Sequence, residues 1–297
     1  MKYALCCGIN TYPNPANALN GCVNDAKDWS TVLSSKFGFE VVSTFDSAVT
    51  HDAILNMLRN KIQAAVPGDI IVFTYSGHGT QVVDQNADET DGYDEALYVY
   101  DGPVVDDELR VVIDAAKPGV QIVIILDSCF SGTSTRKIGT DYMKPKFISN
   151  PLTIGRSKNT KEIPMEEMEE VLLSGCDDDE YSYDAYIGGK YNGAFTANAI
   201  PLLKTSDTYA SFHTALRKVL PSSRYPQSPQ LEGTQENLSR VLFSGEVSTE
   251  PPTPPPVEPP VEPPTPPTTT IGTSGSGCMF TMSMIIVALS ALLYLLL

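Results

Sequence analysis

A histidine and a cysteine, each close behind an apolar segment, are the two residues of this chain best suited to covalent chemistry. His78 lies within the segment YSGHG, and Cys129 lies within the segment DSCFSG. A thiol attacks a carbonyl carbon as its thiolate, and an imidazole within hydrogen-bond reach takes up the thiol proton and later protonates the leaving group. We therefore predict that Cys129 is a nucleophile and that His78 is its acid/base partner.

The surroundings of these two residues distinguish them from ordinary core residues. A cysteine by itself is most often a buried structural residue, and the other two histidines, His51 and His213, lie within helical patterns. Only His78 is flanked by glycines, which permit tight turns and a close approach of substrate to the backbone. We expect the backbone amides of Gly79 and Cys129 to bind the negative oxygen that forms during attack.

Alternating strands and helices are predicted to position the pair. Short apolar runs indicate buried parallel strands, and apolar residues three and four apart indicate helices between them. The strands are expected at residues 3–9, 39–45, 69–75, 120–126 and 171–174, and the helices at residues 24–36, after Thr50, at 194–203 and at 209–220. This alternation predicts a parallel sheet covered on both faces, with both motifs at the edge where sites of open α/β folds are built.

A basic segment interrupts the pattern soon after Cys129. Residues 133–164 are polar and contain Lys or Arg at positions 136, 137, 144, 146, 156, 158 and 161 and Pro at positions 145, 151 and 164. A long segment without regular structure inside a compact domain is usually functional or disordered. We predict a mobile loop here, and a tolerated insertion is the alternative.

Three regions are predicted along the chain. A folded domain covers residues 1–245, a linker rich in Pro and then in Thr, Gly and Ser covers 246–277, and a segment of twenty residues without a charge covers 278–297. The proline run favours a stiff spacer, and twenty residues suffice to span a bilayer as a helix. We expect a single-pass C-terminal tail anchor with a cytosolic domain; a glycosylphosphatidylinositol signal and a buried helix are the alternatives.

Composition limits the partners of the chain. With 20 basic and 36 acidic residues, the net charge of −16 disfavours binding to nucleic acid and to anionic lipid. Basic or neutral substrates fit this charge better. The six cysteines follow neither a disulfide framework nor a metal-binding CxxC spacing, so we interpret them as reduced thiols.

The two motifs resemble those of metacaspases, which are cysteine peptidases of the caspase-like clan. Similar segments also occur along residues 2–243, among them GINTY, LNGCVNDA, DGYDEAL, DDEL, LSGC and GAFT. The separation of 51 residues between His78 and Cys129 (129 − 78) agrees with the roughly fifty residues typical of caspase-type peptidases. The resemblance implies a caspase-like α/β fold, with a mostly parallel central sheet flanked by helices, and an endopeptidase that cleaves after Arg or Lys.

The resemblance also implies an acidic S1 pocket for the basic side chain of the substrate. Asp25 and Asp127 are expected to form this pocket, with Ser76 lining it. Paired carboxylates complement a guanidinium or ammonium group. A favourable charge in the first turn of a helix is the alternative for Asp25.

Calcium is the cofactor that the resemblance implies, and no redox or nucleotide cofactor is expected. Asp94, Asp106 and Asp107 match the family pattern and carry oxygen atoms suited to a hard cation. A further ligand of the family falls at Arg136, which departs from that pattern. Ordinary surface acidity is the alternative for these aspartates.

Self-cleavage within the basic loop follows from the same reading, because proteolysis concentrates in exposed loops and this loop is rich in Lys and Arg. The expected partners are polypeptides with Arg or Lys at P1, and the resemblance implies a monomer. Two alternatives remain: another caspase-clan peptidase with a different P1 preference, and a membrane-anchored scaffold without activity, whose Pro-rich stretch binds domains of the SH3 or WW type.

Overall fold

The computed structural model describes residues 1–83, 93–130, 143–148, 168–177 and 180–246. The chain divides into two units, Met1–Pro255 and Pro256–Leu297, and all described residues belong to the first. No helix of the described residues is long and apolar enough to cross a membrane. The predicted linker and anchor, residues 246–277 and 278–297, lie outside this part of the chain except for Glu246.

A six-stranded sheet forms the centre of the first unit, with strand order β12-β9-β7-β3-β1-β2. All pairs are parallel except β12 with β9. The strands are β1 (Lys2–Gly8), β2 (Glu40–Phe45), β3 (Ile70–Ser76), β7 (Gln121–Asp127), β9 (Val171–Ser174) and β12 (Gln230–Glu232). The first five correspond to the predicted strands. In β3 and β7 every residue is buried, as continuous apolar runs in parallel sheets require.

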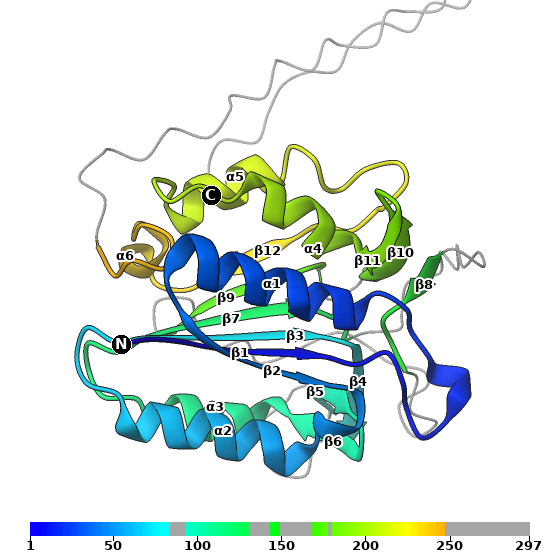
Figure 1. Ribbon diagram of the computed structural model, residues 1–297, viewed down its shortest axis with the longest axis horizontal. Coiled ribbons are helices and arrows are strands. Elements are labelled where there is room, and N and C mark those ends of the chain that lie inside the picture. The colour runs from blue at the N-terminus through cyan, green and yellow to red at the C-terminus, as the bar shows by residue number, and fades with distance from the viewer. Residues whose placement is uncertain (84–92, 131–142, 149–167, 178–179, 247–297) are drawn as a thin grey trace, which may run out of the picture. The chain divides into compact units, whose positions relative to one another are not determined.

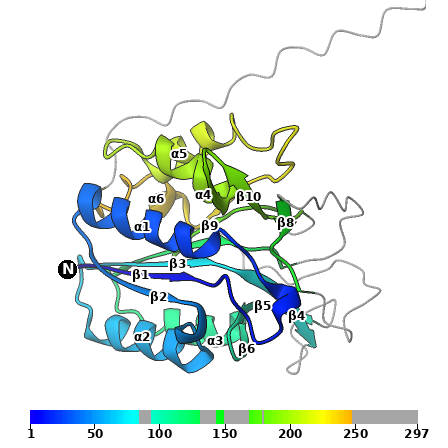
Figure 2. The ribbon, with the colours of Figure 1, turned by 45° about the vertical axis from the view of Figure 1, so that its right-hand side comes forward.

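Helices cover both faces of this sheet (Figure 1, Figure 2). One face carries α1 (Cys22–Phe37), α4 (Ala194–Ala199) and α5 (Tyr209–Leu216), and the other carries α2 (His51–Ala64) and α3 (Asp106–Ile113). Thr50 caps α2 by accepting a hydrogen bond from Ala53 N, and Gly38 ends α1 with a φ of 74° that favours glycine. A four-residue helix, α6 (Gln235–Leu238), follows β12. The predicted mostly parallel sheet flanked by helices is confirmed.

Two small antiparallel sheets lie outside the prediction. One contains β4 (His78–Val83), β5 (Tyr93–Val99) and β6 (Gly102–Val105), and the other contains β8 (Met143–Pro145), β10 (Tyr183–Ile187) and β11 (Lys190–Gly193). These strands are short and their apolar residues do not form long runs, so periodicity alone does not reveal them. One of them, β8, lies inside residues 133–164, where we predicted a loop without regular structure.

Candidate active site

The register of β3 and β7 brings the two sequence motifs together. Ser76 pairs with Asp127 at the carboxyl ends of these neighbouring strands. His78 begins β4 two residues after Ser76, and Cys129 follows Asp127 by the same interval. Both chemically competent residues therefore leave the central sheet at one edge, as the sequence predicted.

His78 is held as a neutral imidazole with one open ring nitrogen. Its Nε2 lies 2.8 Å from the carbonyl oxygen of Asn17, and its backbone N donates to the hydroxyl of Tyr12 at 2.9 Å. Burial lowers the pKa of His78 to about 4. Because a carbonyl only accepts, Nε2 carries the ring proton, which leaves Nδ1 able to accept one. Nδ1 has no hydrogen-bond partner among the described residues.

Cys129 is fully buried, and its thiol is held by the main chain of one residue. Its Sγ lies 3.3 Å from the carbonyl oxygen of Ser182 and accepts from Ser182 N at 2.7 Å. Since Nδ1 of His78 has no partner among the described residues, no hydrogen bond joins the imidazole to the thiol. Cys176, at the end of β9, lies close behind, with its Sγ 3.4 Å from Ser128 O. The five described cysteines, which exclude Cys278, are all free thiols.

A segment of the chain itself lies across these two residues. β8 pairs antiparallel with β10, and beyond it Lys146 N donates to Ser182 O at 2.9 Å. The carbonyl oxygen of Lys146 accepts from the backbone amides of Gly79, at 3.0 Å, and Cys129, at 3.3 Å. These are the two amides that we predicted to bind an oxyanion. The carbonyl oxygen of Lys146 therefore lies at the position that we predict for an oxyanion.

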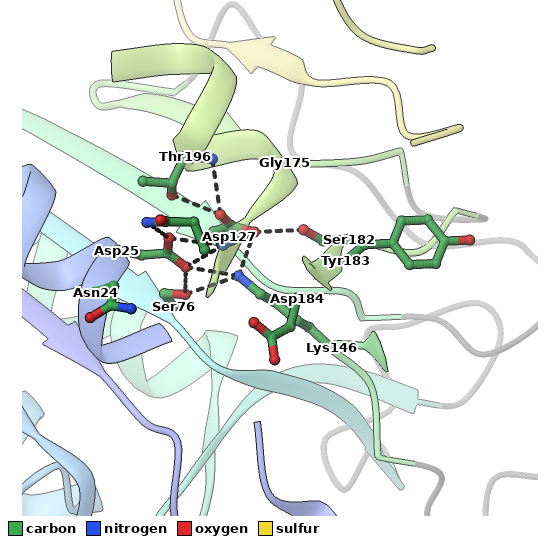
Figure 3. Close-up of polar contacts among 12 residues, drawn as sticks. Asn24, Asp25, Ser76, Asp127, Lys146, Gly175, Ser182, Tyr183, Asp184 and Thr196 are labelled. Atoms are coloured by element: carbon green, nitrogen blue, oxygen red, sulfur yellow. Dashed lines mark hydrogen bonds and ion pairs between the residues drawn. The ribbon is translucent and has the colours of Figure 1, made fainter. Parts of the chain in front are cut away.

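The side chain of Lys146 ends in a buried acidic pocket (Figure 3). Its Nζ lies 2.8 Å from Asp127 Oδ1, 3.2 Å from Asp25 Oδ2 and 3.0 Å from Ser76 Oγ. All four side chains are buried, and the lysine has no exposed surface. Asp25, Ser76 and Asp127 are the three residues predicted to form the S1 pocket, and the structure brings them together around a basic side chain.

Further hydrogen bonds hold the two carboxylates in place. Asp25 accepts from Asn192 Nδ2 at 2.9 Å and from Gly193 N at 2.8 Å, while Asp127 accepts from Ser182 Oγ at 2.6 Å and from Thr196 Oγ1 at 2.7 Å. A Cβ on Gly193 would collide with Asp127 and with Lys146 Nζ, so this position requires glycine. The pocket therefore combines α1, β3, β7, β11 and α4.

The charges within the pocket depend on one another. Burial by itself would lower the pKa of Lys146, but the carboxylates of Asp127 and Asp25 raise it well above its usual range. Burial, opposed by the charge of Lys146 and reinforced by the charge of Asp127, raises the pKa of Asp25 to about 6. The buried ammonium group therefore remains protonated at neutral pH and compensates the carboxylates around it.

The three aspartates predicted to bind calcium lie on two elements. Asp94 is buried in β5, and Asp106 and Asp107 begin α3. Within the described ranges, no group of three or more His, Cys, Asp or Glu side chains is arranged to hold a metal ion. Arg136, at the departure from the family pattern, lies outside these ranges.

Comparison with known proteins shows the family of this chain. Residues 2–136 match the metacaspase, peptidase C14 domain. Metacaspase-1 of Emericella nidulans is 32% identical in an alignment of 298 positions that spans 82% of this chain and 72% of the relative. The chain belongs to the metacaspase family. It is therefore a member of a family of cysteine peptidases, and the resemblance inferred from its motifs is confirmed.

Other relatives of this metacaspase agree in sequence and in fold. Metacaspase-1A of Aspergillus niger is 34% identical in an alignment of 285 positions that spans 77% of this chain and 69% of the relative. A protein of Geobacter sulfurreducens, known from a crystal structure, superposes with a TM-score of 0.63 at 28% identity, over 82% of this chain and 98% of that one. The predicted caspase-like fold is thus confirmed.

Several residues of the site were not predicted from the sequence. They are Asn17 and Tyr12, which hold His78; Ser182, which contacts Cys129 and Lys146; and Lys146 itself. The sequence contained one signal for Lys146, because it belongs to the basic segment that we predicted to be a site of self-cleavage. Nothing in the sequence separates it from the other six basic residues of that segment.

Replacing His78 by glutamine is expected to change how the stability of the metacaspase depends on pH. Because the folded pKa of about 4 lies below the ~6.5 of an unfolded histidine, His78 contributes stability above pH ~6.5 that is lost as the pH falls toward 4. Between pH 7 and pH 5 the wild type should lose about 2 kcal/mol more unfolding free energy than His78→Gln. Urea unfolding at both pH values measures this, and equal losses would contradict it.

A second titrating group of the pocket does not disturb this comparison. The raised pKa of Asp25 acts with the opposite sign, because the folded chain then binds the extra proton. Asp25 is present in both proteins, so its contribution cancels from the difference between them.

Proposed function

We propose that this metacaspase is an endopeptidase that cleaves after Arg or Lys, with Cys129 as nucleophile and His78 as acid/base. The proposal rests on the position of Lys146. Its side chain meets Asp25 and Asp127, and its carbonyl oxygen accepts from two backbone amides beside the thiol. Carboxylates buried around one cation recognise charge, while the amides recognise the carbonyl group of the bond to be cut.

The proposed reaction uses these groups in sequence. The Cys129 thiol gives its proton to Nδ1 of His78 and leaves its contact with Ser182, and Sγ then bonds to the P1 carbonyl carbon. The amides of Gly79 and Cys129 stabilise the oxyanion. The imidazolium protonates the departing amine as the C–N bond breaks, and water hydrolyses the resulting thioester and regenerates the thiol.

Self-processing after Lys146 is part of the proposal. The bond between Lys146 and Phe147 is the one whose carbonyl lies against the two amides, and Ile148 N donates to Gly79 O at 3.0 Å on its far side. While this segment fills the S1 pocket, no other basic side chain can enter it. We infer that the intact chain is latent toward other polypeptides and that cleavage after Lys146 opens the pocket.

Calcium activation, the tail anchor and the polyproline spacer remain proposals from the sequence. Asp94, Asp106 and Asp107 would supply carboxylate ligands together with residues outside the described ranges. A stiff spacer joined to an anchor would restrict cleavage to substrates near one membrane. A scaffold without activity finds no support, because a lysine carbonyl oxygen of the chain itself accepts from the backbone amides of Gly79 and Cys129, next to the two residues suited to catalysis.

Peptide reporters based on residues 143–148 test the P1 preference directly. The full-length chain, purified in detergent, is incubated with and without calcium and then offered peptides that differ only in Arg, Lys or Asp at P1. We expect kcat/KM for Arg and Lys to exceed that for Asp by at least about a hundredfold, because a carboxylate at P1 would meet two buried carboxylates. We also expect calcium to increase the rate and a chelator to abolish the increase.

The outcomes separate the parts of the proposal. Cleavage of the Asp peptide at a similar rate would show a caspase-clan peptidase of different specificity. Equal rates with calcium and with a chelator would remove the metal from the proposal and leave the peptidase intact. Absence of cleavage of all three peptides would contradict the proposed function.

A further inference from the structure

Asp184 is a third buried carboxylate beside the S1 pocket, and neither the motifs nor the proposed reaction assigns it a role. It lies in β10, two residues after Ser182, and only 1% of its surface is exposed. Figure 3 shows its carboxyl group beside the side chain of Lys146. The positive charge of Lys146 acts on Asp184, although burial dominates and raises its pKa above the usual range.

One oxygen of this carboxylate lacks a partner. Asp184 Oδ2 accepts from Asn20 N at 2.7 Å, and the backbone N–H of Gly21 also favours the charged carboxylate, but among the described residues no donor reaches Oδ1 with hydrogen-bond geometry. A Cβ on Gly21 would come within 2.5 Å of Oδ1, so only glycine there leaves room for this oxygen. A buried oxygen without a donor is costly, which points to a donor that the seated lysine does not provide.

Lysine uses all of its donors elsewhere in the pocket. The ammonium group of Lys146 has three N–H donors, and the three acceptors around it are Asp25, Asp127 and Ser76. In the view of Figure 3 the carboxyl group of Asp184 is on the side of the aliphatic stem, and the three hydrogen-bond partners of the ammonium group among the described residues do not include it. The seated lysine therefore leaves one of the three buried carboxylates without a hydrogen bond from the P1 side chain.

Arginine carries donors where lysine has only carbon. Its Nε–H follows Cδ directly, at the place of lysine Cε, and its two terminal NH2 groups remain available for other carboxylates. A guanidinium in this pocket could reach Asp25 and Asp127 with its terminal nitrogens and donate to Asp184 from Nε. Three carboxylates also suit one delocalised cation with five donors better than an ammonium group with three.

We propose that Asp184 is a specificity residue of the S1 pocket that favours Arg over Lys at P1 through its unpartnered Oδ1. This proposal rests on the proposed endopeptidase function and adds a third carboxylate to its pocket. Lys146 is then a weaker P1 residue than arginine. After cleavage, Lys146 should leave the pocket more readily than an arginine would. The pocket then becomes available to substrates with arginine at P1.

Competition between two peptides in one tube measures this preference. The full-length chain is given equal amounts of peptides with Arg and Lys at P1, so that the product ratio reports relative kcat/KM whatever fraction of the enzyme is active. We expect the wild type to favour Arg by about tenfold, the effect of one hydrogen bond to a charged group. In Asp184→Asn, which keeps an oxygen acceptor for Asn20 N, the ratio should fall to about one.

A matched control and a second reporter make the outcome decisive. Asp52→Asn removes an exposed carboxylate that contacts His51 on the opposite face of the sheet and should leave the ratio unchanged. A P1 arginine methylated at Nε lacks the proposed donor, so the wild type should cleave it about tenfold more slowly even if Asp184→Asn fails to fold. A wild-type ratio of one or less, an unchanged ratio in Asp184→Asn, or unaltered cleavage of the methylated peptide would overturn the proposal. Failure to cut either unmodified peptide would instead contradict the proposed function.

Discussion

Cys129→Ala is expected to lower kcat/KM for a P1 Arg peptide by at least about a thousandfold. Without the nucleophile, only substrate binding and oxyanion stabilisation remain to accelerate hydrolysis. Removal of the nucleophile from other hydrolases lowers the rate by this factor or more. The same variant should remain intact during expression, because the wild-type chain is expected to cut itself. Rates with the peptide and gel analysis of the purified chain measure both effects.

Another buried cysteine provides the control for this result. Cys6→Ala removes a thiol that is equally buried, but Cys6 lies within β1 and pairs with Thr74 rather than with a residue of the proposed site. It should retain activity within a few fold of the wild type. If Cys129→Ala kept a substantial part of the activity, the nucleophile would have to be another residue and the proposed reaction would be wrong.

Lys146→Gln is expected to slow self-cleavage between residues 146 and 147 by at least about a hundredfold. Glutamine removes the cation from a pocket with buried carboxylates, and loss of one partner of a buried ion pair typically costs about 3–5 kcal/mol. Mass spectrometry of the incubated chain detects the fragment that begins at Phe147. This fragment should appear with the wild type and be absent with the variant.

Lys144→Gln is the matched control for that experiment. Lys144 lies two residues earlier in the same segment and donates only to the carbonyl oxygen of Ala18, at 2.8 Å, among the described residues. The variant should still be cut after Lys146, within a few fold of the wild-type rate. A fragment that begins after residue 144, or undiminished cutting in Lys146→Gln, would contradict the assignment of Lys146 as the P1 residue.

Much of the fold and the two reactive residues could be predicted from the sequence because local patterns encode them. Continuous apolar runs mark strands that are buried on both faces, as in β3 and β7, and the Gly-rich and Cys-containing motifs follow these strands directly. Neighbouring parallel strands have their carboxyl ends at the same edge of the sheet. This predicts that His78 and Cys129 lie near each other. Asp25 was assigned by its family motif, since α1 alone does not indicate which face meets the pocket.

The occupant of the pocket was decided only by tertiary structure. Lys144 and Lys146 are chemically alike and separated by one proline, so composition and periodicity cannot select between them. The pairing of β8 with β10 and the bonds from Gly79 and Cys129 select Lys146. Asp184 likewise belongs to an acidic stretch of the sequence. Only its packing against Asn20 and Gly21 distinguishes it from acidic residues at the surface. Sequence patterns determine which segments are buried, but long-range pairing determines which charges meet, because partners in these contacts are up to 168 residues apart.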